Sequence, residues 1–401
     1  MNAVTPYRPL SITEWAECFA TASHAQTVVL SHPSDAQVCA QQPGPWANRP
    51  LVSIDPAAVN TIIQLSVGDL MASVETGISV GDFQRQLFAH GVWWPHLYPA
   101  HLLLLDLFQS GLAGLGQWSH HTLKHSVLGT TLLSPHGQQI QSGGRVMKNV
   151  SGYNAHPFLV GSYGQFGALA SVNLRLAVAP RTLTIAQWTL PSWEALSFEG
   201  SPILLWALPE AGQGIIWHGV WVEDAPVLPS EASVETLPFS PGALEQAMTP
   251  VLKALPPWWT SSDNYAIGQL TLSRQRFTTE WSHWASWIQA NAPEGTVGVD
   301  IVQHRMVFAL PASTPESVAT VLQLSNALAE KLRPQTPITW TLTDGTFRWL
   351  SLSPEATLAL WQASPPQPDP MTLALKQTFD PQYTCFDRRM IGWAPEKVTV
   401  L

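Results

Sequence analysis

Hydrophobic residues recur at helical spacing near the start of the chain. Ser11 and Glu14 form the Ser-x-x-Glu pair that closes a helix N-terminus, and apolar residues follow at intervals of three and four. This pattern predicts a helix over residues 11–22. A second helix is predicted to begin after Ser79 and to end at Gly91, because glycine readily adopts the left-handed conformation that ends helices.

Short runs of β-branched and other apolar residues surround these helices, and such runs are typical of strands. The strands predicted before Pro180 lie at residues 27–30, 51–54, 62–65, 71–77 and 172–176. After Pro180 the chain becomes rich in tryptophan and proline, with predicted strands at residues 203–208, 215–222 and 297–302 and predicted helices at residues 278–288 and 314–332. A proline-rich connector then leads to a short predicted helix, residues 371–378. We therefore predict an α+β fold in two units, residues 1–180 and residues 182–365.

The composition limits the classes of protein to which the chain can belong. Its 401 residues are 45% hydrophobic and only 12% charged, which provides for large buried cores and excludes intrinsic disorder. The 28 acidic residues outnumber the 19 lysines and arginines, so the net charge is −9 and the basic surface that nucleic acid requires is missing. We therefore expect no nucleic-acid partner.

The three cysteines, Cys18, Cys39 and Cys385, lie far apart in the sequence and form no CxxC or Cys/His pattern. No disulfide framework, zinc site or iron–sulfur site is therefore indicated. No stretch approaches the roughly 18 to 20 apolar residues of a membrane span. We expect a cytoplasmic protein that meets a membrane only through partner subunits. The 19 tryptophans fit either a subunit interface or a large aromatic core.

The most specific pattern is the glycine-rich segment between residues 142 and 167. Glycines at this density let backbone amides approach a ligand and cradle an anion, and Lys148 and Asn149 add a positive charge and an amide beside them. The segment therefore suits a cofactor that carries phosphates. Tight turns between strands would need the same glycines, and spacing alone does not separate these two interpretations.

The chain resembles the FAD domain of the vanillyl-alcohol-oxidase/PCMH flavoproteins in two segments, GGRVMKNVSGY at residues 143–153 and GSYGQFG at residues 161–167. Within that group it is most similar to the FAD-binding E subunit of glycolate oxidase. The resemblance extends over residues 66–95 and returns at residues 375–381, so it lies at the two ends of the chain.

The resemblance implies FAD bound by the first unit, a cap formed by the second unit, and a C-terminal tail, residues 371–401, that completes the first unit. It also implies that a 2-hydroxy acid such as glycolate transfers hydride to flavin, and that electrons leave through a partner subunit with iron–sulfur clusters. It assigns no catalytic base. The cofactor-binding residues implied by position are Glu75, Pro95, Gly111, Gly114, Gly116, Lys148, Asn149, Gly152, Tyr153, Gly161, Gly164 and Gly167.

Two glycine loops of the family differ in this chain. Residues 31–36 follow a predicted strand but contain no glycine, and they include Asp35, whose charge would repel a diphosphate. The second loop keeps glycines at residues 111, 114 and 116, at shifted positions. These departures support a second hypothesis, a flavin-free structural or assembly subunit that retains the fold.

Other residues with catalytic or metal-binding chemistry have structural explanations. His121 and His125 have the spacing of a metal-binding pair on a helix, but no third ligand is suitably spaced, so we expect polar loop residues or donors to a cofactor phosphate. His304 and Arg305 could supply a base and an arginine fork for a hydroxy acid, although a solvated face explains them better. A stripe at helical spacing, expected in a core or subunit interface, comprises Trp281, Trp284 and Trp287.

Overall fold

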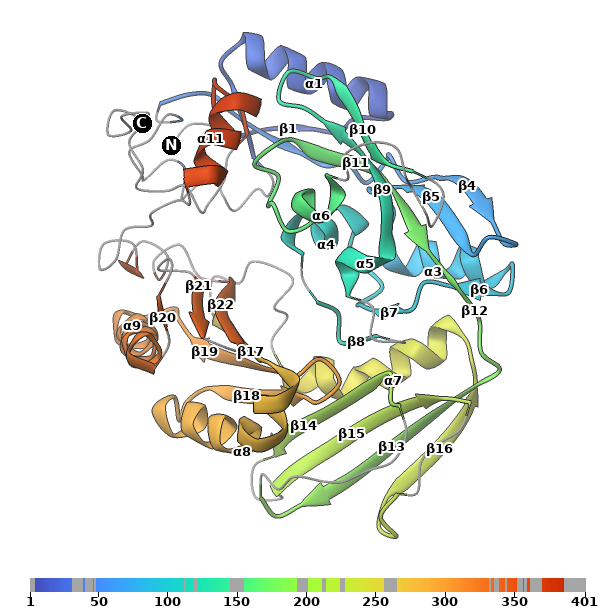
Figure 1. The fold of residues 1–401 in the computed structure, drawn as a ribbon, viewed down its shortest axis with the longest axis vertical. Coiled ribbons are helices and arrows are strands. Elements are labelled where there is room, and N and C mark those ends of the chain that lie inside the picture. Colours follow the sequence, from blue (N-terminus) through green and yellow to red (C-terminus); the bar gives the residue numbers. More distant parts are fainter. Residues whose placement is uncertain are drawn as a thin grey trace.

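The computed structural model describes residues 4–30, 39, 46, 48–111, 113–117, 122–144, 155–192, 201–210, 214–223, 228–255, 265–331, 333–334, 339–342, 345–351, 356, 359–360 and 370–385. Helices and strands are mixed throughout, and the predicted α+β class is confirmed. Figure 1 shows two parts, one above the other. We call the upper part, the described residues of 4–178 and 370–385, the N-terminal unit, and the lower part, the described residues of 182–360, the sheet unit. The boundaries predicted for domains remain a prediction.

A small parallel sheet opens the N-terminal unit. Its order is β1-β3-β2, with β1 at Val4–Tyr7, β3 at Leu51–Ile54 and β2 at Val28–Leu30. Helix α1 (Ile12–His24) packs against β2 and is capped by the Ser11 hydroxyl, which accepts the Glu14 amide. The helix predicted over residues 11–22 and the strands predicted over residues 27–30 and 51–54 are confirmed. The sequence pattern misses β1, because a four-residue edge strand that contains a proline carries little strand signal.

A five-stranded antiparallel sheet forms the larger layer of the N-terminal unit. Its strands, in spatial order, are β10 (Gln139–Gly143), β9 (Val127–Leu133), β11 (Ala168–Arg175), β5 (Met71–Glu75) and β4 (Ile62–Ser66). The helices of this part are α3 (Val80–Phe88), α4 (Leu104–Ser110), α5 (Leu123–Ser126) and α6 (His156–Leu159). The remaining short strands are β6 (Val92–Trp93), β7 (His96–Leu97), β8 (Gly116–Gln117) and β12 (Ala177–Val178).

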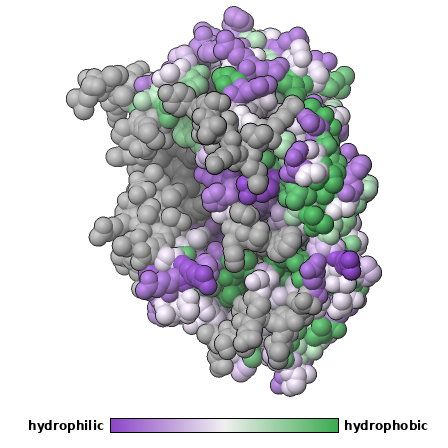
Figure 2. All heavy atoms as spheres, turned by 45° about the vertical axis from the view of Figure 1, so that its right-hand side comes forward, coloured by the Kyte–Doolittle hydropathy of each residue, from purple (hydrophilic) through white to green (hydrophobic). Residues whose placement is uncertain are grey.

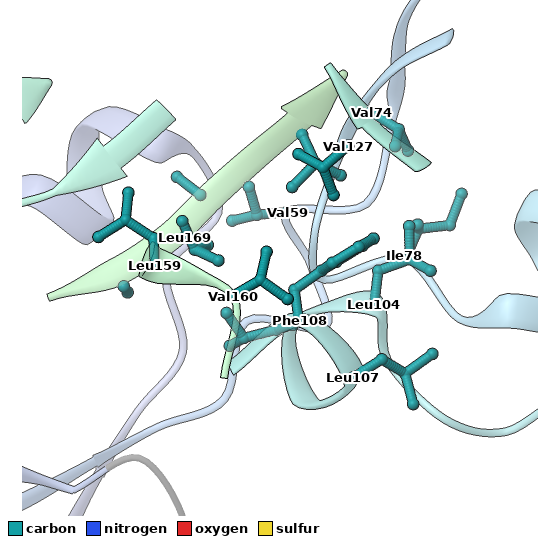
Figure 3. Close-up of a cluster of buried hydrophobic side chains, with 14 of the residues drawn as sticks. Val59, Val74, Ile78, Leu104, Leu107, Phe108, Val127, Leu159, Val160 and Leu169 are labelled. Atoms are coloured by element: carbon teal, nitrogen blue, oxygen red, sulfur yellow. The ribbon is translucent and has the colours of Figure 1, made fainter. Parts of the chain in front are cut away.

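Helix α4 lies in the hydrophobic core under this sheet. Figure 3 shows Phe108 of α4 among Val160, Leu104 and Ile78, and all four side chains are buried. The core therefore fixes α4, which carries the glycine loop at its C-terminal end. Helix α3 begins after Ser79 as predicted, but it ends at Phe88 and not at Gly91, which lies in the following turn with a φ of +70°.

The sheet unit is built on one ten-stranded sheet. Its strands, in spatial order, are β16 (Ser233–Pro238), β13 (Thr182–Leu190), β15 (Gly214–Val222), β14 (Leu204–Glu210), β18 (Thr296–Asp300), β19 (Arg305–Pro311), β17 (Tyr265–Leu272), β22 (Gly345–Ser351), β21 (Thr339–Leu342) and β20 (Arg333–Pro334). Its helices are α7 (Pro241–Ala254), α8 (Arg274–Asn291) and α9 (Pro315–Lys331).

Helix α8 carries the predicted tryptophan stripe into the core. Trp281 and Trp284 are buried and Trp287 packs against them, so this stripe belongs to the hydrophobic core, as one of the two interpretations expected. The sequence pattern misses α7, because Gly242 and Pro250 inside the helix weaken its helical signal, although Ser240 and Pro241 are a typical helix start.

The C-terminal helix α11 (Pro370–Phe379) lies against the N-terminal unit (Figure 1). After it, the main chain reaches the small sheet, where the Val29 amide donates to the Thr384 carbonyl at 2.6 Å. The tail from residue 386 onward lies outside the described residues. The described part of the tail thus extends the small sheet beside β2.

The outer surface carries exposed apolar side chains at the edge of the five-stranded sheet. Ile63 of β4 is 49% exposed, Val67 directly after β4 is exposed as well, and Val178 is exposed on β12, which pairs with β6 in a separate two-stranded sheet. Figure 2 shows hydrophobic surface on the side of the molecule that carries β4 and β5 in Figure 1. None of the described helices combines the length and the hydrophobicity that crossing a membrane requires.

Candidate functional site

The glycine loop after α4 meets the second glycine turn of the chain. Gly111 ends α4 in the left-handed conformation, with a φ of +63°, and a Cβ atom there would lie 2.8 Å from the Cα of Gly161. The Gly161 amide donates to the Phe108 carbonyl at 2.8 Å, and the Tyr163 amide donates to the Gln109 carbonyl at 2.7 Å. The last turn of α4 is therefore capped by the turn that contains Gly161.

The turn over residues 161–167 contains three glycines with positive φ. These values are +85° at Gly161, +73° at Gly164 and +127° at Gly167. A side chain at Gly167 would collide with the Leu133 carbonyl, so this glycine is needed for packing on β9. Gly164 and Gly167 also line a small cavity, which suits a turn that comes close to a ligand or to another part of the protein.

This cavity lies in the seam between the small sheet and the five-stranded sheet, and we call it the seam cavity. Its walls include Trp15, Phe19, Leu30, Leu105 and Gln109. Its volume is about 20 Å³, which is room for about one water molecule. In the described residues, apolar side chains therefore fill most of this part of the seam.

Helix α4 directs its N-terminus toward a turn of the protein itself. The Leu104 amide donates to the Ile78 carbonyl at 3.0 Å, and the Leu105 amide donates to the Thr76 carbonyl at 2.8 Å. Asp106 lies in the first turn of α4, where its negative charge interacts favourably with the helix dipole but would repel a bound anion. These two amides are engaged within the protein and do not form a phosphate cradle.

The chain is similar to known proteins in parts of its sequence and in its fold. No family model matches the chain. Glycolate oxidase subunit GlcE of Escherichia coli is 32% identical over 112 residues, which is 28% of this chain and 32% of the relative. A mitochondrial D-lactate dehydrogenase (cytochrome) of Arabidopsis thaliana is 23% identical over 141 residues, 35% of this chain and 25% of the relative. The matched segments thus span a third or less of these relatives.

The fold is similar to solved structures over almost its whole length. Two crystal structures of alkyldihydroxyacetonephosphate synthase align with TM-scores of 0.59 and 0.57, each over 95% of this chain and over 75% and 76% of the other chains, at 12% identity. The predicted resemblance to the FAD-binding PCMH-type flavoproteins is confirmed. The seam, the α4 loop and the turn over residues 161–167 therefore belong to a PCMH-type fold.

The structure brings together some of the residues that the resemblance implies. Gly111, Gly161, Gly164 and Gly167 lie around the C-terminal end of α4 and the seam cavity. Gly114 and Gly116 lie elsewhere in the PCMH-type fold, between the N-terminal unit and the sheet unit, since a side chain at Gly116 would collide with the Ile203 carbonyl. Their role in cofactor binding remains a prediction.

Glu75 and Pro95 are engaged within the PCMH-type fold. The Glu75 carboxylate accepts hydrogen bonds from the amide and the hydroxyl of Thr61, both at 2.8 Å. Pro95 is buried between β6 and β7. Four further predicted cofactor ligands lie outside the described residues: Lys148, Asn149, Gly152 and Tyr153.

Sequence reasoning does not single out His156, which opens α6 directly after the motif that contains Lys148. Burial lowers the pKa of His156 from its ordinary value. Its buried Nδ1 atom has no hydrogen-bond partner among the described residues. A polar atom of this kind next to the motif is a signal that only the structure can give, because burial depends on the tertiary fold.

The expectation of a solvated face at Arg305 is wrong. The Arg305 side chain is completely buried, and its Nε donates to Asp300 Oδ2 at 2.9 Å. Burial raises the pKa of Asp300 to about 6, although the Arg305 guanidinium opposes this shift. Arg305 also donates to backbone carbonyls of the glycine loop, so it is part of the contact between the two units.

No group of three or more metal-ligating side chains occurs among the residues that the structure describes. His125 is exposed, and its Nδ1 lies 2.9 Å from the Thr122 hydroxyl. His125 lies in the one-turn helix α5 and not in the loop that we expected, and His120 and His121 lie outside the described residues.

Proposed function

We propose that this chain is an FAD-binding subunit of an oxidoreductase of the glycolate oxidase type. The observation that carries the proposal is the positive-φ glycine turn over residues 161–167, packed on α4 in a PCMH-type fold. The relatives named glycolate oxidase subunit and D-lactate dehydrogenase support FAD as the cofactor and a 2-hydroxy acid as the substrate.

The residues that would hold FAD are those of the glycine turn and of the neighbouring motif. Gly161 and Gly164 let the backbone come close to a ligand, and Lys148 supplies a positive charge for its phosphates. FAD, when bound, supplies the acceptor for hydride. Arg305 is not the fork that binds the substrate carboxylate, because its guanidinium is engaged by Asp300 and by the glycine loop.

The proposal requires a partner that takes the electrons. An iron–sulfur cluster is held by four cysteine thiolates, and this chain has three cysteines in all. Cys385 is buried and Cys18 is partly buried, and burial raises the pKa of both thiols, so neither is prepared to bind metal. A separate subunit with iron–sulfur clusters is the partner we infer.

A specific observation favours a second candidate function, a flavin-free structural subunit of such a complex. Leu105 and Phe19 line the seam cavity, whose volume is only about 20 Å³, and the first loop of the family lacks its glycines here. In this alternative, the PCMH-type fold is kept for assembly with catalytic subunits, and the glycines serve only internal packing.

The absorption spectrum of the purified protein distinguishes the two proposed functions. Protein prepared with and without added FAD is examined for the flavin band near roughly 450 nm, which the cofactor alone supplies. A stoichiometric band that is bleached anaerobically by glycolate or D-lactate supports the oxidoreductase. Protein that remains colourless after incubation with FAD supports the structural subunit.

A matched pair of variants tests the site itself. Gly164→Val places a side chain at a positive-φ position that lines the seam cavity, so it should lower flavin occupancy. Gly91→Val is the control, because Gly91 has a similar φ of +70° and a Cβ there has no neighbour within 4 Å. Equal occupancy in the two variants would contradict the assignment of the turn to FAD.

A further inference from the structure

Three consecutive backbone carbonyls of the glycine loop accept hydrogen bonds from side chains of the sheet unit. Arg305 Nη1 donates to the Ala113 carbonyl at 3.2 Å, and Arg305 Nη2 donates to the Gly114 carbonyl. The Gly114 carbonyl also accepts Gln303 Nε2 at 2.7 Å. Trp206 Nε1 donates to the Leu115 carbonyl at 2.8 Å. The sheet unit thus fixes the path of the loop one residue after another.

The guanidinium that makes two of these bonds is itself held from several sides. Arg305 Nε donates to Asp300 Oδ2 at 2.9 Å, Arg305 Nη1 donates to Gln269 Oε1 at 3.3 Å, and the guanidinium lies 5.6 Å from the centre of the Trp206 ring. The side chains of Arg305 and Asp300 are both 0% exposed. Buried charges are retained only where each has such partners, so this group has one orientation.

Gln303 makes the second contact to the Gly114 carbonyl from a more open position. The side-chain Nε2 of Gln303 also donates to Asp300 Oδ2 at 2.9 Å, and the backbone amide of Gln303 donates to Asp300 Oδ1 at 3.2 Å. Asp300 therefore orients both donors, since it accepts from Arg305 and from Gln303.

The loop that these groups hold is continuous with the glycine turn. Ala113 lies two residues after Gly111, and the backbones of Gly111 and Gly161 are in close contact. The carbonyls of Phe108 and Gln109 accept the amides of the turn over residues 161–167. A change in the path of residues 113–115 therefore acts on the same helix end that supports that turn.

We propose that Arg305 is a positioning residue for the cofactor site, which holds the loop over residues 113–115 in the shape that the glycine turn requires. This inference rests on the proposed function, because it assigns FAD to that turn. A lysine cannot replace Arg305, since a single ammonium group does not reproduce the planar fork that contacts two carbonyls and a carboxylate together.

The test compares Arg305→Lys and Gln303→Ala with a control of the same chemistry, Arg276→Lys. Arg276 pairs with Glu280 on α8, where the two side chains are 25% and 36% exposed. For the full chain and each variant, the dissociation constant of FAD and the flavin absorption spectrum are measured, together with the unfolding midpoint. Groups that orient a site from outside typically change affinity by roughly tenfold to a hundredfold at metal centres.

We expect Arg305→Lys to weaken FAD binding by about the same factor and to shift the flavin band, with a smaller effect in Gln303→Ala and none in Arg276→Lys. Folded variants that bind FAD with unchanged affinity and spectrum would overturn the proposal and leave the proposed function intact. If Arg305→Lys does not fold, Gln303→Ala decides by the same criteria, because it removes one of the two donors to Gly114. A wild-type chain that binds no FAD in this titration would overturn both the proposed function and the positioning role of Arg305. The wild-type measurement alone shows this outcome, so it is distinguishable from a failure of the Arg305 proposal.

Discussion

Lys376→Met tests how the C-terminal segment is held on the N-terminal unit. Lys376 Nζ donates to Asp380 Oδ2 at 2.7 Å, to the Gln165 carbonyl at 2.6 Å and to the Cys385 carbonyl at 2.7 Å. The side chains of Lys376 and Asp380 are both 0% exposed. Asp380 also accepts the amides of Thr384 and Cys385, each at 2.8 Å. The pair therefore joins α11, the end of the described tail and the glycine turn.

The expected loss of stability follows from what methionine leaves behind. Asp380 would remain buried without its counter-charge, and the carbonyls of Gln165 and Cys385 would lose a donor. Breaking a buried pair in this way costs about 3–5 kcal/mol. An exposed pair contributes about 0–1 kcal/mol, so Arg85→Met, which breaks the exposed pair with Asp82, is the matched control.

The assay is denaturant unfolding of wild type and variants, followed by far-UV circular dichroism and by tryptophan fluorescence. Hydrogen exchange over residues 370–385 shows whether the loss is local to α11 and the tail. The double variant Lys376→Met with Asp380→Asn should recover part of the loss, because it no longer buries an unpaired charge. A Lys376→Met protein within about 1 kcal/mol of wild type would refute the reasoning, since that is the effect of an exposed pair.

Three further predictions use other parts of the fold. Gly111→Ala should cost about 1–3 kcal/mol of folding free energy, because alanine is strained at a φ of +63° and its Cβ would meet Gly161; Gly68→Ala should cost much less, and equal unfolding midpoints would contradict this. Burial lowers the pKa of His218 from 6.5, so the folded protein should lose stability when the pH falls below 6.5. The loss of unfolding free energy is at most about 1.4 kcal/mol per pH unit. A His218→Gln variant whose stability keeps the wild-type dependence on pH would exclude this residue as the cause. Lys148→Glu should lower flavin occupancy by placing a negative charge beside the phosphates, and unchanged absorbance at the flavin band would count against that role.

Local sequence patterns predict most of the helices and strands because the signals are themselves local. Ser11 and Glu14 lie three residues apart, and the Ser11 hydroxyl accepts a hydrogen bond from the Glu14 amide as expected, while the Glu14 carboxylate accepts one from the Leu10 amide. The pattern fails for α7, where Pro250 lies inside a helix that tertiary packing on the sheet stabilises. Intrinsic propensity is a weak guide wherever such packing decides the outcome.

The partners of buried charges could not be predicted from the sequence. Arg305 contacts Ala113 across 192 residues, and Lys376 contacts Gln165 across 211 residues. Neither separation leaves a periodic signal, and an isolated arginine after a strand is most often solvated. Only the packing of the sheet unit on the N-terminal unit turns Arg305 into a buried group with fixed partners.

The glycine pattern predicts where the backbone is crowded, and the structure shows two different causes of that crowding. Gly167 is required by its contact with Leu133, and Gly116 by its contact with Ile203, so these glycines are explained by packing within the chain. Gly161 and Gly164 have positive φ values, and at Gly161 a Cβ would approach no atom closer than 3.6 Å. A positive φ favours glycine in any such turn, as at Gly91 after α3, where a Cβ would meet no atom within 4 Å. The glycines of residues 161–167 therefore follow from turn geometry and from packing on α4 and β9, and the flavin titration, not the number of glycines, decides whether the turn binds FAD.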